Sequence, residues 1–241
     1  MTDNIHFKIK GAYQHDAIEN GICFQRSWHS LKYQKALQLL ELNENDTVLD
    51  AACGSGVLTG MMAEKYKCRV VGADFSTAAI EFCKRQYIHT NLEFITLDLT
   101  DKYFGEDAFS KIVMLEIVEH LQPDATTKIL KNIYTYLQPG GKLIISTPNK
   151  NSLWPVIELM LDTLGLTPKM KNEQHVQLYT KKTLRTVLLQ HGFKVNLIES
   201  SHFLAPWLSF FGLKAAEKIH SLEQKIKIFP GSLLFAIVEK E

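Results

Sequence analysis

The chain has 241 residues, of which 46% are hydrophobic and 22% are charged, and its formal net charge is +1. This length suits one α/β domain with elaborations, because a single core can grow to roughly 250–300 residues before it divides. The balanced charge gives no electrostatic argument for a nucleic acid or another polyanion as partner. The four cysteines have no metal-ligand spacing and are typical of reduced, mostly buried residues in a cytosolic protein.

In chain order, residues 1–10 are polar and lack the apolar stretch of a signal peptide, and an amphipathic helix follows at 24–42, where we expect it to cover the sheet edge. From about residue 43, short β-branched runs alternate with helical periodicity, which predicts βαβ units and a parallel sheet. The expected strands are 47–52, 69–73, 92–97, 111–115, 142–147, 194–199 and 233–239. The expected helices between them are 57–65, 77–87, 125–137 and 181–190.

The predicted fold class is α/β, with a Rossmann-like, doubly wound, seven-stranded sheet that is mostly parallel and has an antiparallel last strand. We expect residues 1–241 to form one domain. Two stretches are longer than the alternation needs: residues 149–179, the first cap segment, and residues 200–231, the second cap segment. Both leave the carboxyl end of a strand, where ligands bind in open α/β sheets, so we expect helical caps that carry substrate specificity.

A glycine loop follows the first predicted strand and opens the next helix, in the run from Asp50 to Gly56. Glycines let the backbone approach a ligand closely, and the helix offers unpaired N–H groups and a positive dipole end. Asp50 would repel a pyrophosphate there but attract an ammonium. A ligand with both a carboxylate and an ammonium suits the two features together, and the methionine moiety of S-adenosylmethionine is such a ligand.

Acidic residues also end the next two strands. Asp74 lies 24 residues after Asp50, which suits a carboxylate that accepts hydrogen bonds from ribose hydroxyls. Asp98 could accept a hydrogen bond from an adenine amino group while Leu99 packs against the ring. Each residue alone has a plainer explanation, since Asp50 could cap a helix and Asp74 could be a solvated loop residue.

The glycine spacing also resembles a nicotinamide fingerprint, in Gly54, Gly56 and Gly60. That spacing is one residue too long, and Asp50 stands where a pyrophosphate would be disfavoured. A nicotinamide oxidoreductase is therefore a distant alternative.

Five segments in order resemble the motifs of class I S-adenosylmethionine-dependent methyltransferases: Asp-Ala-Ala-Cys-Gly-Ser-Gly at 50–56, Asp74, Asp98-Leu99, 116–121 and Leu-Gln-Pro-Gly-Gly at 137–141. The match covers about 24–147 and departs at Ala52, where the family usually has its first glycine. The resemblance implies S-adenosylmethionine as cofactor, with Lys32 near its carboxylate and the Leu115 backbone near its amino group. The implied cofactor-binding residues are Lys32, Asp50, Ala52, Cys53, Gly54, Gly56, Asp74, Phe75, Asp98, Leu99 and Leu115.

Chemistry at the methyl acceptor needs a base or a metal, because a phenol with a pKa near ~10 is a poor nucleophile at neutral pH. Glu116, Glu119 and His120 are three and four residues apart and share a face if they are helical. They could hold a divalent cation that activates the acceptor oxygen, and manganese, iron or zinc is as arguable as magnesium. The same Glu-His-Leu sequence is widespread in class I enzymes without a metal, so both interpretations stay open.

Together with Thr147-Pro148-Asn149 and the Glu173-x-His175-Val176 segment, these residues resemble the O-methyltransferases of ubiquinone biosynthesis. That resemblance implies O-methylation of a lipophilic small molecule, a phenol, catechol or quinone precursor, with Glu116, His120 and His175 as catalytic candidates. N- or C-methylation of a small molecule or lipid head group is the second hypothesis. A methyltransferase-like binding module without catalysis is the third, and no motif favours nucleic acid as a substrate.

Both cap segments contain apolar residues at helical spacing, within 152–164 and 204–218, and each stripe has a tryptophan near its start. Such helices either lie at a membrane surface or pack on the sheet. We expect a cytoplasmic protein with peripheral membrane contact through these stripes. The oligomeric state stays open.

Overall fold

The structure is a computed structural model that describes residues 11–156, 159, 163, 175–206, 208–209, 212–226 and 230–241. Its strands are β1 (Thr47–Ala51), β2 (Arg69–Asp74), β3 (Leu92–Thr96), β4 (Phe109–Leu115), β5 (Leu137–Pro148), β6 (Phe193–Ser201) and β7 (Leu233–Lys240). Its helices are α1 (Tyr13–Glu19), α2 (Cys23–Leu40), α3 (Val57–Tyr66), α4 (Thr77–Gln86), α5 (Pro123–Tyr136), α7 (Lys181–Gln190) and α8 (Leu213–Ile226), with a 3₁₀ turn η1 (Val118–His120).

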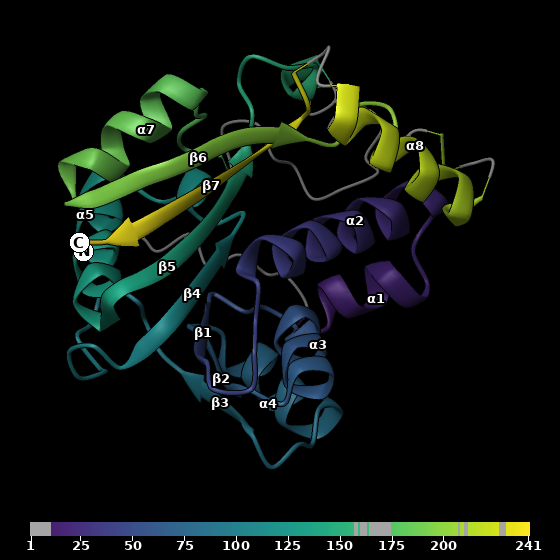
Figure 1. The fold of residues 1–241 in the computed structure, drawn as a ribbon. Coiled ribbons are helices and arrows are strands. Elements are labelled where there is room, and N and C mark those ends of the chain that lie inside the picture. Colours follow the sequence, from purple (N-terminus) through teal and green to yellow (C-terminus); the bar gives the residue numbers. More distant parts are fainter. Residues whose placement is uncertain are drawn as a thin grey trace.

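The strands form one sheet in the order β3-β2-β1-β4-β5-β7-β6 (Figure 1). The pairs from β3 to β5 are parallel, and β7 is antiparallel to both of its neighbours. The predicted Rossmann-like sheet with an antiparallel last strand is confirmed. The strand order reverses between β1 and β4, and such switch points are where open α/β sheets bind ligands.

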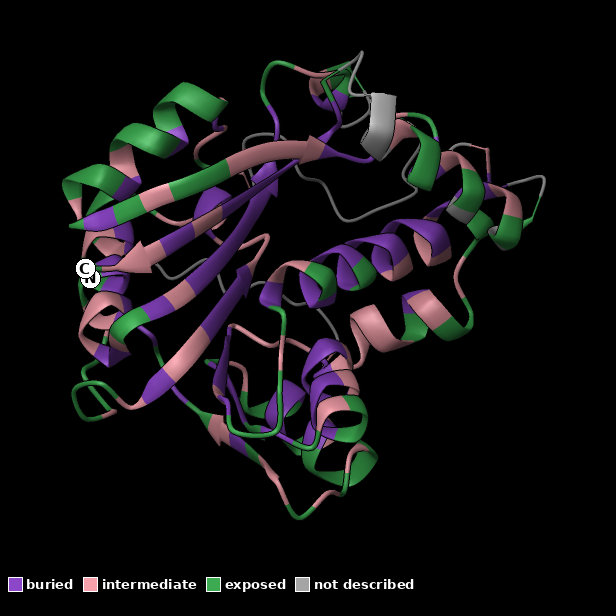
Figure 2. Cartoon of the chain, viewed as in Figure 1, coloured by how far each residue is buried: buried purple, intermediate pink, exposed green. Residues whose placement is uncertain are grey.

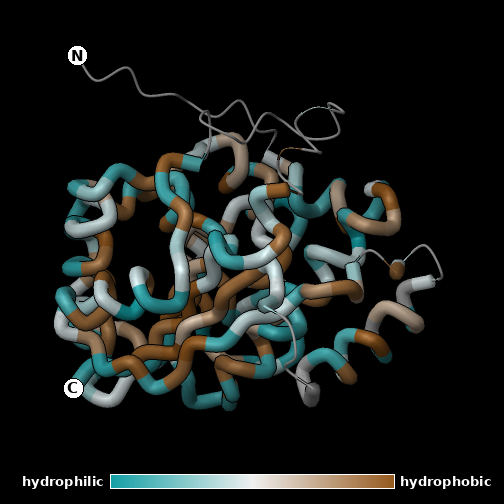
Figure 3. Tube along the Cα trace, turned by 90° about the horizontal axis from the view of Figure 1, so that it is seen from above, coloured by the Kyte–Doolittle hydropathy of each residue, from teal (hydrophilic) through white to brown (hydrophobic). Residues whose placement is uncertain are grey.

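Two hydrophobic cores cover the two faces of the sheet. One core joins the central strands to α5 and α7, and the other joins them to α2 and α3. Every predicted strand is present, and the five inner strands are buried over most of their length, whereas the edge strands β3 and β6 are largely half-buried or exposed (Figure 2). Figure 3 shows hydrophobic residues concentrated along the middle of the molecule, with hydrophilic residues on many of the outer turns. This pattern is expected for strands covered on both faces.

Helix α2 lies differently from the prediction of an amphipathic helix over the sheet edge. It crosses the sheet face, where its residues pack with Val113, Ile144 and Phe235 from three strands. Its two lysines that face inward, Lys32 and Lys35, are only 4% and 6% exposed. Burial of these charges is tolerated because each lysine pairs with a carboxylate, a long-range contact that helical periodicity does not reveal.

The two cap segments meet at their bases beside the ends of β5 and β6. The Asn149 side-chain amide donates to the carbonyl of Gly231 at 2.9 Å, and the Asn149 N–H donates to Ser232 at 2.8 Å. In the second cap segment the helix expected within 204–218 begins later, at Leu213. The Glu223 carboxylate of that helix accepts the N–H groups of Leu204 and Ala205, which ties α8 to the preceding turn.

Helix α1 was not expected from the sequence. Only Ala17 of its seven residues is buried, so it has no apolar stripe that a pattern search could find. Among the described residues, no helix is both long and apolar enough to cross a membrane.

Candidate active site

The glycine loop after β1 has the left-handed backbone that its glycines allow. Gly54 has a φ of 54° and Gly56, at the start of α3, has a φ of 72°. Ala52 shares this conformation, with a φ of 63°, although it carries a side chain. A left-handed conformation costs an L-residue roughly 1–2 kcal/mol, so the departure from the family pattern is a point of backbone strain. Cys53, between these residues, is half-buried.

Asp50 is the second-last residue of β1, beside this loop, and is buried. Its carboxylate accepts a hydrogen bond from the Thr59 hydroxyl of α3 at 2.6 Å. Burial raises the pKa of Asp50 to about 7, and the charge of Asp74 also acts in that direction. A carboxyl held in this state gains from an arriving cation, because a nearby positive charge favours the ionised form.

Asp74 ends β2 and fixes the shape of the loop. One carboxylate oxygen accepts the Gly54 N–H and the other accepts the Ser76 N–H, both at 2.9 Å. Burial raises the pKa of Asp74, although these two N–H groups oppose the shift. Each carboxylate oxygen has a second lone pair, so the residue can still accept ribose hydroxyls.

Helix α1 also contacts this loop. The Gln14 side-chain carbonyl accepts the Ser55 N–H at 3.0 Å, and the Ser55 hydroxyl accepts the His15 N–H at 3.0 Å. A Cβ at Gly54 would stand 2.5 Å from the Gln14 amide nitrogen, so the glycine makes room for this contact. The sequence gives no signal for Gln14 or His15, since both lie in a short polar segment 40 residues before the loop.

The other cofactor-binding candidates are arranged at the ends of the neighbouring strands. Phe75 is 51% exposed after β2, and Asp98 is exposed after β3, where its carboxylate accepts the N–H and hydroxyl of Thr100. Leu99 beside it is buried. Leu115 ends β4 and is half-buried. All four therefore lie at the carboxyl edge of the sheet, where β1 to β4 end.

Lys32 of α2 and Glu116, the residue after β4, form an ion pair. Glu116 has a φ of 52°, a left-handed conformation that turns the chain sharply at the strand end. Burial alone would raise the pKa of Glu116, but the charge and hydrogen bond of Lys32 outweigh it and lower the pKa to about 2. Glu116 is therefore ionised and paired.

A second cluster, the acceptor cluster, consists of Glu119, His120 and His175. Their nitrogen and carboxylate oxygen atoms lie within 4.8 Å of one another. The two imidazole rings have centroids 5.0 Å apart, and a Glu119 oxygen lies 4.0 Å from His120 Nε2. That oxygen is buried and has no hydrogen-bond partner among the described residues. The sequence motif suggested Glu116 as the third member, whereas the structure places His175 there and Glu116 with Lys32.

Backbone contacts hold the acceptor cluster together. The Glu119 carbonyl accepts the N–H groups of Val176 and Gln177, at 2.8 and 3.0 Å, and the Thr147 hydroxyl donates to the Glu119 carboxylate at 2.9 Å. Burial, and then the charge of Glu116, raise the pKa of Glu119 to about 8. The end of the first cap segment is thus fastened to the turn η1.

Aromatic rings line the acceptor cluster on the side of α2. Trp154 of the first cap segment has its ring centroid 6.3 Å from His175 and 5.0 Å from Trp28. The ring centroid of His202, the residue after β6, lies 5.0 Å from that of Trp28. Trp154 is 6% exposed, so it packs inward rather than toward a membrane, and Trp207 lies outside the described residues.

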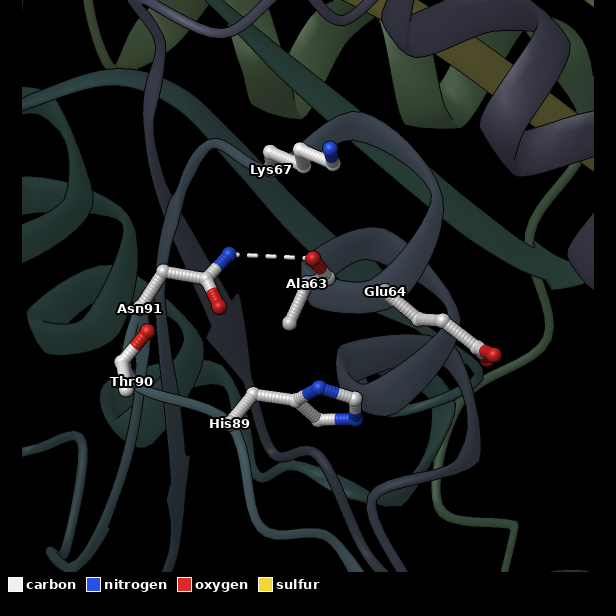
Figure 4. A pocket seen from close by; sticks show the side chains of 6 residues that line it. All are labelled: Ala63, Glu64, Lys67, His89, Thr90 and Asn91. Atoms are coloured by element: carbon white, nitrogen blue, oxygen red, sulfur yellow. Dashed lines mark hydrogen bonds between the residues drawn. The ribbon is translucent and has the colours of Figure 1, made fainter.

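A shallow hollow of about 320 Å³ lies elsewhere, between the end of α3 and the start of β3 (Figure 4). The Asn91 amide at its side donates to the carbonyls of Ala63 and Cys68, which holds two chain segments together. This hollow is at the amino ends of the parallel strands, opposite the edge where the candidate residues gather.

The chain belongs to the class I S-adenosylmethionine-dependent methyltransferases, to which its sheet order, glycine loop and strand-end carboxylates correspond. Within that class it belongs to the family described as a methyltransferase domain, whose model matches residues 25–197. The matched residues include the strands from β1 to β4 and all three residues of the acceptor cluster.

Curated relatives match only in part. Phosphoethanolamine N-methyltransferase 1 of Arabidopsis thaliana is 28% identical over 148 residues, which is 61% of this chain and 30% of that protein. Ubiquinone biosynthesis O-methyltransferase of Coxiella burnetii is 33% identical over 108 residues, 43% of this chain and 44% of that protein. The aligned part thus spans less than half of either relative.

Solved structures share the fold. A putative methyltransferase from Haloferax volcanii, in complex with the Trm112 methyltransferase activator, superposes with a TM-score of 0.66. The two chains are 19% identical, and the match covers 95% of this chain and 96% of that one. At this identity the likeness shows the fold alone.

Proposed function

We propose that the protein transfers a methyl group from S-adenosylmethionine to a hydroxyl of a small lipophilic acceptor such as a phenol, catechol or quinone precursor. The acceptor cluster carries this proposal: a buried carboxylate and two imidazoles meet at the carboxyl ends of β4 and β5, where Glu119 lies close enough to Glu116 to feel its charge. In the reaction the acceptor oxygen forms a bond to the methyl carbon as the carbon–sulfur bond breaks. The products are the methyl ether, S-adenosylhomocysteine and a proton.

The residues divide this work. Asp74 would accept ribose hydroxyls, Asp98 and Leu99 would bind the adenine, and the loop at 52–56 would face the methionine end. Alignment of the donor and acceptor supplies much of the rate in such displacements. The acceptor proton would go to His175 or His120, which are suited to this because an imidazole titrates near neutral pH.

A divalent cation in the acceptor cluster is part of the same proposal. One carboxylate and two imidazoles form a donor set that suits zinc, manganese or iron better than magnesium, and the unpartnered Glu119 oxygen is an available ligand. Bound there, a cation would lower the pKa of the acceptor hydroxyl. Metal analysis of the purified protein and activity measurements after chelation test this. Bound metal and loss of activity on chelation would support the cation, and full activity without metal would support proton transfer to an imidazole alone.

N-methylation of a small amine or lipid head group is the second candidate. It is supported by the match to the plant phosphoethanolamine N-methyltransferase, which extends over 148 residues against 108 for the ubiquinone enzyme. An ammonium acceptor must also lose a proton before it attacks, so the acceptor cluster fits this chemistry as well.

Peripheral membrane contact of a cytoplasmic protein remains a proposal for the first cap segment. Its side chains Leu153, Val156 and Leu159 are 53%, 65% and 51% exposed, and Val176 is 45% exposed. An exposed apolar group near the acceptor site suits a lipophilic substrate that partitions into a bilayer. Flotation with liposomes tests this contact directly.

The deciding experiment incubates the protein with methyl-labelled S-adenosylmethionine and either a polyprenyl catechol or phosphoethanolamine. Labelled methyl ether from the catechol supports the proposal, and labelled methylated amine supports the second candidate. If the protein binds the cofactor but neither reaction gives a labelled product, both proposed acceptor classes are contradicted.

A further inference from the structure

Two buried lysine–glutamate pairs extend from the same helix toward the same sheet face. Lys32 pairs with Glu116 after β4, and Lys35 pairs with Glu199 of β6. The side chains of the first pair are 5% and 19% exposed, and those of the second pair are 6% and 14% exposed. The pairs are alike in chemistry and burial, and they differ in the strand that supplies the carboxylate.

Only the Lys32–Glu116 pair lies at the switch point of the sheet. Asp50 is the second-last residue of β1, which pairs in parallel with β4, and Glu116 directly follows β4. The charge of Lys32 acts on Asp50, and the charges of Glu116 and Asp50 both act on the buried Tyr33 of α2. Asp50, Lys32 and Glu116 therefore share one neighbourhood beside the glycine loop.

We propose that the Lys32–Glu116 pair opens when the cofactor binds and exchanges its partners with the methionine zwitterion, Lys32 taking the carboxylate and Glu116 the ammonium. This assignment rests on the proposed function, because it presumes that S-adenosylmethionine is the ligand. It makes Glu116 a cofactor-binding residue.

Charge balance is the physical reason. If the ligand carboxylate paired with Lys32 and nothing paired with Glu116, the Glu116 carboxylate would become an unpaired charge. An unpaired charge is strongly unfavourable in a site that is largely closed to water. An ammonium that arrives with the carboxylate restores the balance, since two pairs replace one. The ammonium has three donors, enough to reach Glu116, Asp50 and the Leu115 carbonyl at once.

The backbone of Glu116 supports this role. Its φ of 52° is a left-handed conformation that residues with a side chain rarely adopt, and such strain gathers at ligand-binding positions. Its N–H donates to the Ser146 carbonyl at 3.0 Å, so the turn is held in place by β5. The carboxylate is thereby directed to α2 and the switch point rather than along the strand.

The test compares S-adenosylhomocysteine with 5′-methylthioadenosine, which lacks the amino-acid part, by calorimetry. We expect Lys32→Met and Glu116→Gln each to weaken S-adenosylhomocysteine binding at least tenfold while methylthioadenosine binding changes less than twofold. Decarboxylated S-adenosylmethionine keeps the ammonium but lacks the carboxylate, so it separates the role of Glu116 from that of Lys32. Glu116→Gln should weaken its binding, and Lys32→Met should not.

The control variants are Lys35→Met and Glu199→Gln, which break the matched pair. They should lower the melting temperature and leave the affinity ratio of the two ligands unchanged. Where a single variant at the first pair fails to fold, Lys32→Met/Glu116→Gln removes both charges together and should show the same selective loss. An unchanged ratio in the folded variants of the first pair overturns the inference, whereas a wild-type protein that binds no S-adenosylhomocysteine overturns the proposed function itself.

Discussion

The proposed cofactor half and the proposed acceptor half of the site are built in different ways. The proposed cofactor half uses residues at or just after the ends of β1, β2 and β3, and its loop is fixed by contacts such as Asp74 to Gly54. The proposed acceptor half is assembled from distant segments, because His120 lies before the first cap segment and His175 lies near its end. Local sequence motifs therefore predict the first half. The second half depends on contacts between residues that are far apart in the sequence.

The largest effect is expected from the acceptor half. His175→Ala and Glu119→Gln should each lower kcat about 10²–10³-fold, because a positioned proton acceptor contributes on this scale. The dissociation constant of S-adenosylhomocysteine should change less than twofold. His191→Ala is the control, since the His191 ring bonds to the Val187 carbonyl in α7, away from the cluster. Wild-type kcat in His175→Ala would remove His175 from the mechanism.

Asp50→Asn should weaken S-adenosylhomocysteine binding about 10–100-fold, since a hydrogen bond to a charged group contributes roughly 1.5–3 kcal/mol. The matched control is Asp46→Asn, at another buried aspartate, whose carboxylate holds Ser110 and Asn43. That variant should lose stability and keep its ligand affinity. Equal affinity in Asp50→Asn and the wild type would show that the strand-end charge does not face the cofactor.

The pH dependence of cofactor affinity follows from the same residue. Because burial raises the pKa of Asp50 to about 7, most of this carboxyl is protonated at pH 6 and ionised at pH 8. The ammonium prefers the ionised form, so the affinity for S-adenosylhomocysteine should rise about tenfold from pH 6 to pH 8. Titration calorimetry at several pH values measures this, and the profile should be flat in Asp50→Asn. A rise that persists in that variant contradicts the assignment.

The smallest effect concerns Ala52. Ala52→Gly removes a left-handed penalty of roughly 1–2 kcal/mol and adds glycine's entropic cost of roughly 0.5–1 kcal/mol, so we expect about 0.5 kcal/mol of added stability. Denaturant unfolding measures the change, and ligand affinity should be retained. Ala51→Gly is the control, since Ala51 lies in β1 without a positive φ and should lose stability. Destabilisation in both variants would show that the loop tolerates Ala52 without strain.

The sequence predicted the sheet well because buried parallel strands are short β-branched runs between helical periods. It also located Asp50, Asp74 and Asp98 at strand ends, since strand boundaries and glycine loops are local features. Other features depend on contacts between distant residues. Nothing near Lys32 shows that it pairs with Glu116, 84 positions away, and Gln14 has no local pattern that points to Ser55.

The acceptor cluster was predicted in part. Helical spacing grouped Glu116 with Glu119 and His120, which assumes a regular turn after β4. The left-handed φ of Glu116 breaks that turn and directs this side chain toward α2, while Val176 and Gln177 bring His175 to Glu119. Backbone handedness at one residue thus decided which side chains meet, and spacing alone does not encode it.

The contact of α1 with the glycine loop has a consequence for the speed of turnover. The helix has seven residues, of which only Ala17 is buried, and its hydrogen bonds to the loop involve Ser55. Its ring contacts, Tyr13 with His29 and His15 with Phe82, join it to helices rather than to strands. The helix can therefore detach without disturbing the sheet, because local opening needs little free energy where little surface is buried. We therefore expect spent cofactor to leave at a rate set by the detachment of this one short helix, independently of how fast the methyl group moves.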